Sequence, residues 1–166
     1  MSDTAGPSGL STARVSALVT LRMLIGWHFL YEGLVKVLNP RWTAAEYLTE
    51  SQGILSGLFH WLASDPSRLA LVDFANRWGL VLIGVGLIAG LLTRYAIIAG
   101  ILILALYYLC NPPLPGLAYS KPAEGSYLIV NKVLIEAVAL WVLLLFPTSQ
   151  IVGLDRLLAR ETGDAR

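Results

Sequence analysis

Residues 15–37 read VSALVTLRMLIGWHFLYEGLVKV, a mostly apolar run of 23 residues that decides the fold. As a helix that rises about 1.5 Å per residue, this run is long enough to cross a hydrocarbon core of about 30 Å. Four ionisable residues interrupt it: Arg22, His28, Glu32 and Lys36. At about 100° per residue they fall within a sector of about 120°, so the predicted helix has one polar flank. Charges inside a membrane usually face a bundle interior, so the rest of the chain must supply a partner for this flank.

The composition is that of an integral membrane protein that forms one domain. Of the 166 residues, 56% are hydrophobic and only 14% are charged, which differs clearly from the balance of a soluble domain. The formal net charge of +1 provides no basic field for nucleic acid. The single cysteine, Cys110, excludes an internal disulfide and a Cys-x-x-Cys redox pair.

Three further apolar runs predict three further membrane helices, so we expect an all-α integral membrane protein built as a four-helix bundle. Clusters of proline, glycine and asparagine separate the runs and end the helices. The predicted spans cover residues 15–37, 74–92, 95–109 and 127–146. The bundle is expected to occupy residues 14–158, between a disordered tail at 1–13 and a C-terminal tail at 159–166.

The segment between the first two predicted spans is neither clearly apolar nor clearly polar. Aromatic residues recur in it at roughly helical spacing, and Trp and Tyr are favoured at the interface between membrane and water. Glu46, Glu50, Asp65 and Arg68 leave no run of about 20 apolar residues. We therefore expect residues 41–72 to form short interfacial helices and not a fifth span.

The distribution of basic residues gives the expected orientation. Four spans place both termini on one side of the membrane, and that side carries slightly more basic residues than the other. Basic loops tend to stay in the cytoplasm, so the difference favours cytoplasmic termini. The side with the termini carries Arg14, Arg94, Arg156, Arg160 and Arg166, and the other side carries Arg41, Arg68, Arg77 and Lys121.

All four predicted spans bring polar residues to one level, in the half of the membrane away from the termini. Counting residues from the helix boundaries puts Glu32 at the depth of Lys132, and His28 at the depth of Glu136. Because the charges of Glu32, Lys36, Lys132 and Glu136 sum to zero, we expect them to form one buried ion-pair network between the first and last spans. The other residues expected at a polar pocket on this level are His28, Asp73, Tyr107, Tyr108 and Asn131, with Asn76, Arg77 and Asn111 nearby.

Two interpretations of these charges stay open. They are either mutually neutralising struts that fix how the helices pack, or the lining of a ligand or redox pocket. Elsewhere, Arg22 is expected to extend to the nearby headgroups, and His60 is expected at the interface. Cys110 is expected to be structural. The glycines of GVGLIAG, residues 84–90, are expected to serve helix packing, because no strand precedes them as in a nucleotide-binding motif.

The sequence offers no ligand set for a metal cofactor. Two histidines and one cysteine, in no ligand spacing, predict that this chain holds no haem, iron–sulfur or zinc site. No triad-like arrangement of serine and histidine is evident. The sequence also shows no electron carrier, so a redox role requires a second, catalytic subunit.

Five stretches carry a resemblance to a known family. They are RMLIGWHFLYEGLVKVLNPRW (22–42), SQGILSGLFHWLAS (51–64), WGLVLIGVGLIAGLLTRYAIIAG (78–100), LYYLCNPP (106–113) and GSYLIVNKVLIEAVALWVLLLFPTSQIVGLD (125–155). Together they resemble the DoxX family of bacterial four-helix membrane proteins, which is grouped with DoxD, the membrane subunit of thiosulfate:quinone oxidoreductase. The most specific parts are G-x-x-K at Gly33–Lys36 and N-K-x-L-I-E at 131–136, followed by GLD at 153–155.

The resemblance implies a four-helix bundle in the bacterial inner membrane that works with redox enzymes. Quinone is the proposed electron acceptor in the DoxD branch. A common pattern in the family has histidine just before the first glycine of the G-x-x-K motif, and this chain has Glu32 there. No histidine role therefore carries over to that position.

Two functions are expected from these observations. In the first, the chain is the membrane subunit of an oxidoreductase and passes electrons from a partner subunit to quinone. Lys36 or Lys132 would bind a quinone carbonyl, and Glu32 or Glu136 would relay protons. The rings of Tyr107 and Tyr108 would pack on the quinone.

In the second, the chain is a non-enzymatic anchor or assembly partner for an exported protein. Residues 38–75 and 111–125 would form the docking surface, and the buried charges would be structural. A small transporter is disfavoured, because the chain shows no internal repeat. The electron donor, a role for thiosulfate and homo-oligomerisation stay open.

Overall fold

The computed structural model describes residues 11–117, 119–120 and 128–156, and this part of the chain is helical and contains no β-sheet. The expected all-α class is therefore confirmed for these residues. Most of the predicted tails, 1–10 and 159–166, lie outside the described residues. The helices are α1 (Thr12–Leu38), α2 (Ala45–Thr49), α3 (Ser56–Ala63), α4 (Pro66–Ala89), α5 (Thr93–Cys110) and α6 (Lys132–Leu145), followed by the 3₁₀ helix η1 (Thr148–Gln150).

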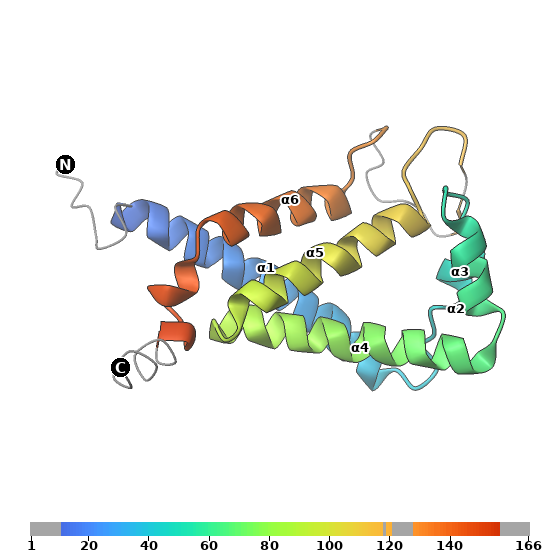
Figure 1. The fold of residues 1–166 in the computed structure, drawn as a ribbon, viewed down its shortest axis with the longest axis horizontal. Coiled ribbons are helices and arrows are strands. Elements are labelled where there is room, and N and C mark those ends of the chain that lie inside the picture. The colour runs from blue at the N-terminus through green and yellow to red at the C-terminus, as the bar shows by residue number, and fades with distance from the viewer. Residues whose placement is uncertain (1–10, 118, 121–127, 157–166) are drawn as a thin grey trace, which may run out of the picture.

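Figure 1 shows α1, α4, α5 and α6 running alongside one another, with α2 and α3 across one end. The packing contacts are made by α1 with α4 and α6, and by α5 with α4 and α6. We call the end that carries α2 and α3 the loop end. The opposite end, which carries the start of α1, the turn between α4 and α5, and η1, is called the tail end.

Three helices, α1, α4 and α5, are long and apolar enough to cross a membrane, which is consistent with a multi-pass membrane protein. The fourth predicted span is shorter than expected. Helix α6 has 14 residues and so a length of about 21 Å, less than a hydrocarbon core of about 30 Å. It begins at Lys132 because the Asn131 side chain accepts a hydrogen bond from the Leu134 amide at 2.9 Å and caps the helix. The predicted start near Tyr127 lies outside the described residues.

Helix α4 begins earlier than the predicted Phe74. The Asp65 carboxylate accepts hydrogen bonds from the amides of Ser67 and Arg68, both at 3.0 Å, and Pro66 occupies the first turn. An acceptor followed by proline is a strong helix start. Hydropathy alone could not show this start, because the first two turns of α4 belong to the mixed region and not to the apolar run.

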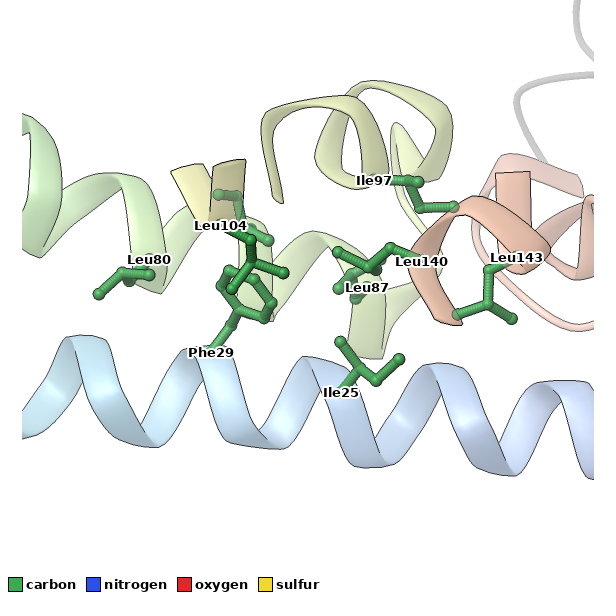
Figure 2. Packing of buried hydrophobic residues seen from close by; sticks show 9 residues of the cluster. Ile25, Phe29, Leu80, Leu87, Ile97, Leu104, Leu140 and Leu143 are labelled. Atoms are coloured by element: carbon green, nitrogen blue, oxygen red, sulfur yellow. The ribbon is translucent and has the colours of Figure 1, made fainter. Parts of the chain in front are cut away.

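The helices that lie alongside one another share an apolar core. In Figure 2, Ile25 and Phe29 point from α1 toward leucine side chains of α4, α5 and α6. Inside a membrane, an apolar side chain is removed from water equally well by lipid and by protein. Close packing and polar contacts must therefore hold the helices together. The buried members of the core are Ile25, Phe29, Leu80, Ile83, Leu87, Ile97, Leu104, Leu140 and Leu143.

Glycines bring α1 and α4 into direct backbone contact. A Cβ atom added at Gly84 would lie 2.7 Å from the Leu30 Cα of α1. A Cβ atom added at Gly33 would lie 2.7 Å from the Val81 amide nitrogen of α4. Small residues allow this approach, as in other membrane helix pairs, so the packing role expected for the glycine-rich run holds at Gly84.

We expect Gly84→Ala to lower the apparent melting temperature of the detergent-solubilised protein, because the added methyl group meets backbone atoms that cannot move aside. Gly79→Ala is the matched control in the same helix, since nothing lies within 4 Å of its added Cβ atom. Equal melting temperatures for the two variants would show that α1 and α4 do not depend on this close approach.

Arg22 does not extend to the headgroups as predicted. It is only 1% exposed, and its Nη2 donates to the Val152 carbonyl at 2.7 Å. Its Nη1 donates to the Thr148 hydroxyl at 3.2 Å. The prediction was wrong because the segment after α6 folds back over the tail end and supplies acceptors for the guanidinium group.

The same segment caps α5 through Asp155. Its carboxylate accepts hydrogen bonds from the amides of Leu92 at 2.7 Å and Thr93 at 3.2 Å, and its own amide donates to the Gly90 carbonyl at 2.8 Å. Burial acts to raise the pKa of Asp155. Hydrogen bonds from Ser149, Thr93 and Leu92 outweigh that effect and hold the pKa below its usual value.

A lowered carboxyl pKa stabilises the fold above the pKa of the unfolded chain, and this contribution is lost as the pH falls through the folded-state value. Asparagine keeps an acceptor oxygen but loses the charge at the start of α5, so we expect Asp155→Asn to be less stable than wild type at pH 7 by roughly 0.3–1 kcal/mol. In thermal unfolding, the difference between the two proteins should shrink as the pH is lowered below about 4. A difference that stays constant over this range would contradict the assigned role of the charge.

Candidate functional site

A pocket of about 180 Å³ lies between α1, α4, α5 and α6, in the half of the molecule nearer the loop end. Apolar side chains of all four helices line it, together with ionisable side chains of α1, α5 and α6. Polar and apolar surfaces therefore meet in one small space, as in sites that orient a mostly apolar ligand. The lining residues are His28, Phe29, Glu32, Lys36, Leu80, Leu104, Tyr107, Lys132, Val133 and Glu136.

One hydrogen-bonded pair of ionisable side chains joins α1 to α6 at the pocket. The Nδ1 atom of His28 lies 2.7 Å from the Glu136 Oε1 atom. The His28 side chain is 49% exposed and the Glu136 side chain is only 14% exposed. The histidine thus connects a nearly buried carboxylate with the surroundings of the helices, which is the arrangement that a proton path needs.

Lys36 is a second polar group at the pocket, separate from the His28–Glu136 pair. Its ammonium group lies 3.6 Å from the Glu32 carboxylate one turn earlier, and 3.4 Å from the Tyr107 hydroxyl of α5. It also lies 5.3 Å from the centre of the Trp42 ring, within the range of a cation–π contact. The Lys36 side chain is 15% exposed, so its charge is held at the pocket by contacts on several sides.

The Tyr107 hydroxyl is held by contacts from two helices. It lies 2.7 Å from the Asn76 side-chain amide of α4, and it accepts from the Lys36 ammonium group of α1 at 3.4 Å. A hydroxyl can both donate and accept hydrogen bonds. These contacts hold the hydroxyl at the lining of the pocket, where it can hydrogen-bond a ligand.

The outer helix α2 holds Tyr107 in place. The ring of Tyr47 meets the ring of Tyr107 edge-on at 5.9 Å between centres, and the Tyr47 hydroxyl donates to the Tyr107 carbonyl at 2.9 Å. Nothing in the spacing of the sequence indicated this contact. Asn76 and Trp42 likewise belong to the support of the site, although sequence reasoning placed only Asn76 at the right level.

Six of the nine predicted site residues come together at the pocket: His28, Glu32, Lys36, Tyr107, Lys132 and Glu136. The other three lie elsewhere. Tyr108 donates to the Ile129 carbonyl at 2.7 Å, Asn131 caps α6, and Asp73 accepts from the Ala44 amide at 2.8 Å. Each of these three holds a chain segment in place.

The charged side chains pair differently from the predicted network of Glu32, Lys36, Lys132 and Glu136. The pair that joins α1 to α6 is His28–Glu136, and Lys36 pairs with Glu32 within α1. Counting residues from the helix boundaries correctly predicted that His28 lies at the same depth as Glu136. Depth alone could not show that the Lys36 side chain points toward Tyr107 and Trp42, because the orientation of a side chain depends on its neighbours. Lys132 lines the same pocket.

Comparison of the chain with protein-family models, with curated proteins and with solved structures finds no match. The site is therefore interpreted from its own geometry.

We expect His28→Ala to destabilise the protein, because it leaves the nearly buried Glu136 carboxylate without its hydrogen-bond partner. The cost of such a loss is about 1–3 kcal/mol, and thermal unfolding in detergent would measure it. His60→Ala is the matched control, since His60 lies exposed on α3. A loss as large in the control as in His28→Ala would mean that the His28–Glu136 contact contributes nothing of its own.

Proposed function

We propose that this chain is a DoxX-like membrane subunit of an oxidoreductase complex, and that it binds a quinone and passes electrons to it from a partner subunit. The observation that carries the proposal is the Tyr107 hydroxyl, held beside the Lys36 ammonium group at the lining of the pocket. Two donors at one end of a small, mostly apolar pocket favour a ligand that is flat, apolar and equipped with acceptor oxygens. A quinone head group has these properties.

Reduction of a quinone to a quinol adds two electrons and two protons. Tyr107 and Lys36 would bind one carbonyl oxygen and stabilise the negative charge that develops on it. The His28–Glu136 pair would supply protons, because its histidine is half exposed and its carboxylate lines the pocket. The electrons would come from a partner oxidoreductase subunit.

The half-exposed side chains of His28 and Glu32 also support lateral access to the pocket. Ionisable groups in a membrane helix seldom face lipid, because a charge in hydrocarbon is costly, and they usually mark a functional site. An opening beside them would admit the quinone head while its tail stays in the bilayer. In this proposal α6 and the segment before it complete a fourth span, both termini are cytoplasmic, and the bilayer is the bacterial inner membrane.

We expect the purified wild-type protein to bind a short-chain quinone, and Tyr107→Phe to lower the affinity about tenfold, in line with the loss of one hydrogen bond to a charged or strongly polar acceptor. Tyr108→Phe is the matched control, because the Tyr108 hydroxyl bonds to the Ile129 carbonyl outside the pocket. Equilibrium titration followed by quinone absorbance would measure both variants.

Equal losses in the two variants, or a folded wild-type protein that binds no quinone, would contradict the proposal. The second result would favour the alternative function, a membrane anchor for an exported protein. Its docking surface would be the loop end, where Ile54 is 98% exposed between α2 and α3.

A further inference from the structure

A groove of about 700 Å³ lies at the tail end, between the beginning of α5 and the end of α6. It exists because α6 ends at Leu145, after which the chain turns at Pro147 and packs against the turn between α4 and α5. The chain thus leaves the space beside the first turns of α5 open. This groove is separate from the pocket at His28 and Tyr107 and shares no lining residue with it.

The groove changes from apolar to polar along its length. Ile97 of α5 and the last three leucines of α6 line one part, and Leu145 is exposed there. Arg94 and Gln150 line another part, beyond the end of α6. An apolar surface on membrane helices that leads to a cation at their end matches the structure of a lipid with a charged headgroup.

Arg94 gives the polar part of the groove a positive charge, and the Asp155 carboxylate also lines the groove. Arg94 is the second residue of α5, where the helix dipole is already positive. The Asp155 carboxylate accepts hydrogen bonds from the Leu92 and Thr93 amides at the start of α5, so the fold itself binds this negative charge. Of the ion pairs formed among the described residues, none includes Arg94, and its side chain is exposed.

We propose that this groove binds one phospholipid with a net negative headgroup. The phosphate contacts Arg94, and an acyl chain lies along the leucines at the end of α6. A lipid with a neutral, zwitterionic headgroup fills the apolar part equally well, but its own cationic group competes for the phosphate. The site therefore discriminates by headgroup charge, and it does so whether or not the chain binds quinone.

Native mass spectrometry of the detergent-solubilised full chain would test the site by titration with phosphatidylglycerol and with phosphatidylcholine of the same acyl composition. We expect wild type to bind phosphatidylglycerol more tightly. Arg94→Gln should lower that affinity about fivefold and leave phosphatidylcholine unchanged, as one lost contact between a cation and an anionic lipid predicts. Arg94→Lys should retain most of the affinity.

The matched control is Arg14→Gln. Arg14 is also an exposed arginine at the tail end, but it lies on α1 and does not line the groove. An unchanged affinity in Arg94→Gln would overturn the proposal. An equal loss in Arg14→Gln would also overturn it, because the effect would then reflect the overall charge of the protein.

Leu144→Trp tests the apolar half of the site independently of charge. A larger side chain on the wall should narrow the groove and lower the affinity for both lipids. If both lipids bind this variant as they bind wild type, no acyl chain lies in the groove and the proposal is wrong.

Discussion

Ionisable side chains in a membrane helix need partners, and the apolar run of α1, residues 15–37, carries four of them. Arg22 donates hydrogen bonds at the tail end to Thr148 and Val152, in the segment that follows α6. His28 pairs with α6, and Lys36 contacts both Glu32 on its own helix and Tyr107 on α5. Apart from the Lys36–Glu32 pair, each of these contacts joins α1 to a different part of the chain. The fourth neighbour, α4, is held by another means, the direct backbone approach at its glycines.

The polar groups also explain why the site lies where it does. Tyr107 receives hydrogen bonds from α1 and α4 and is covered by the ring of Tyr47 from α2. Four helices therefore determine the position of one hydroxyl. A group fixed from so many sides can hydrogen-bond a ligand without reorganising when the ligand arrives, which is the basis of preorganised binding.

The sequence was sufficient for features that depend on composition and length. The all-helical class of the described residues, three helices long and apolar enough to cross a membrane, and the short helices near residues 45–63 follow from apolar runs and their interruptions. The depth of polar residues also followed from counting, which brought His28 and Glu136 together. The start of α4 at Pro66 and the short α6 depend on capping by Asp65 and Asn131, which hydropathy does not register. The covering of Arg22 and the capping of α5 by Asp155 depend on where a distant segment folds, and no local pattern contains that information.

The contacts of Arg22 have a consequence for the order in which the protein is made. Its partner Thr148 lies 126 residues further along the chain. At a synthesis rate of about 5–20 residues per second, the guanidinium group waits about 6–25 s for its acceptors. Until then the guanidinium group needs other partners, such as water or lipid phosphates, because an unpaired charge in hydrocarbon is costly. A product truncated before Thr148 would lack both of these acceptors, so α1 and the segment after α6 can be joined at Arg22 only after the last helix has been made.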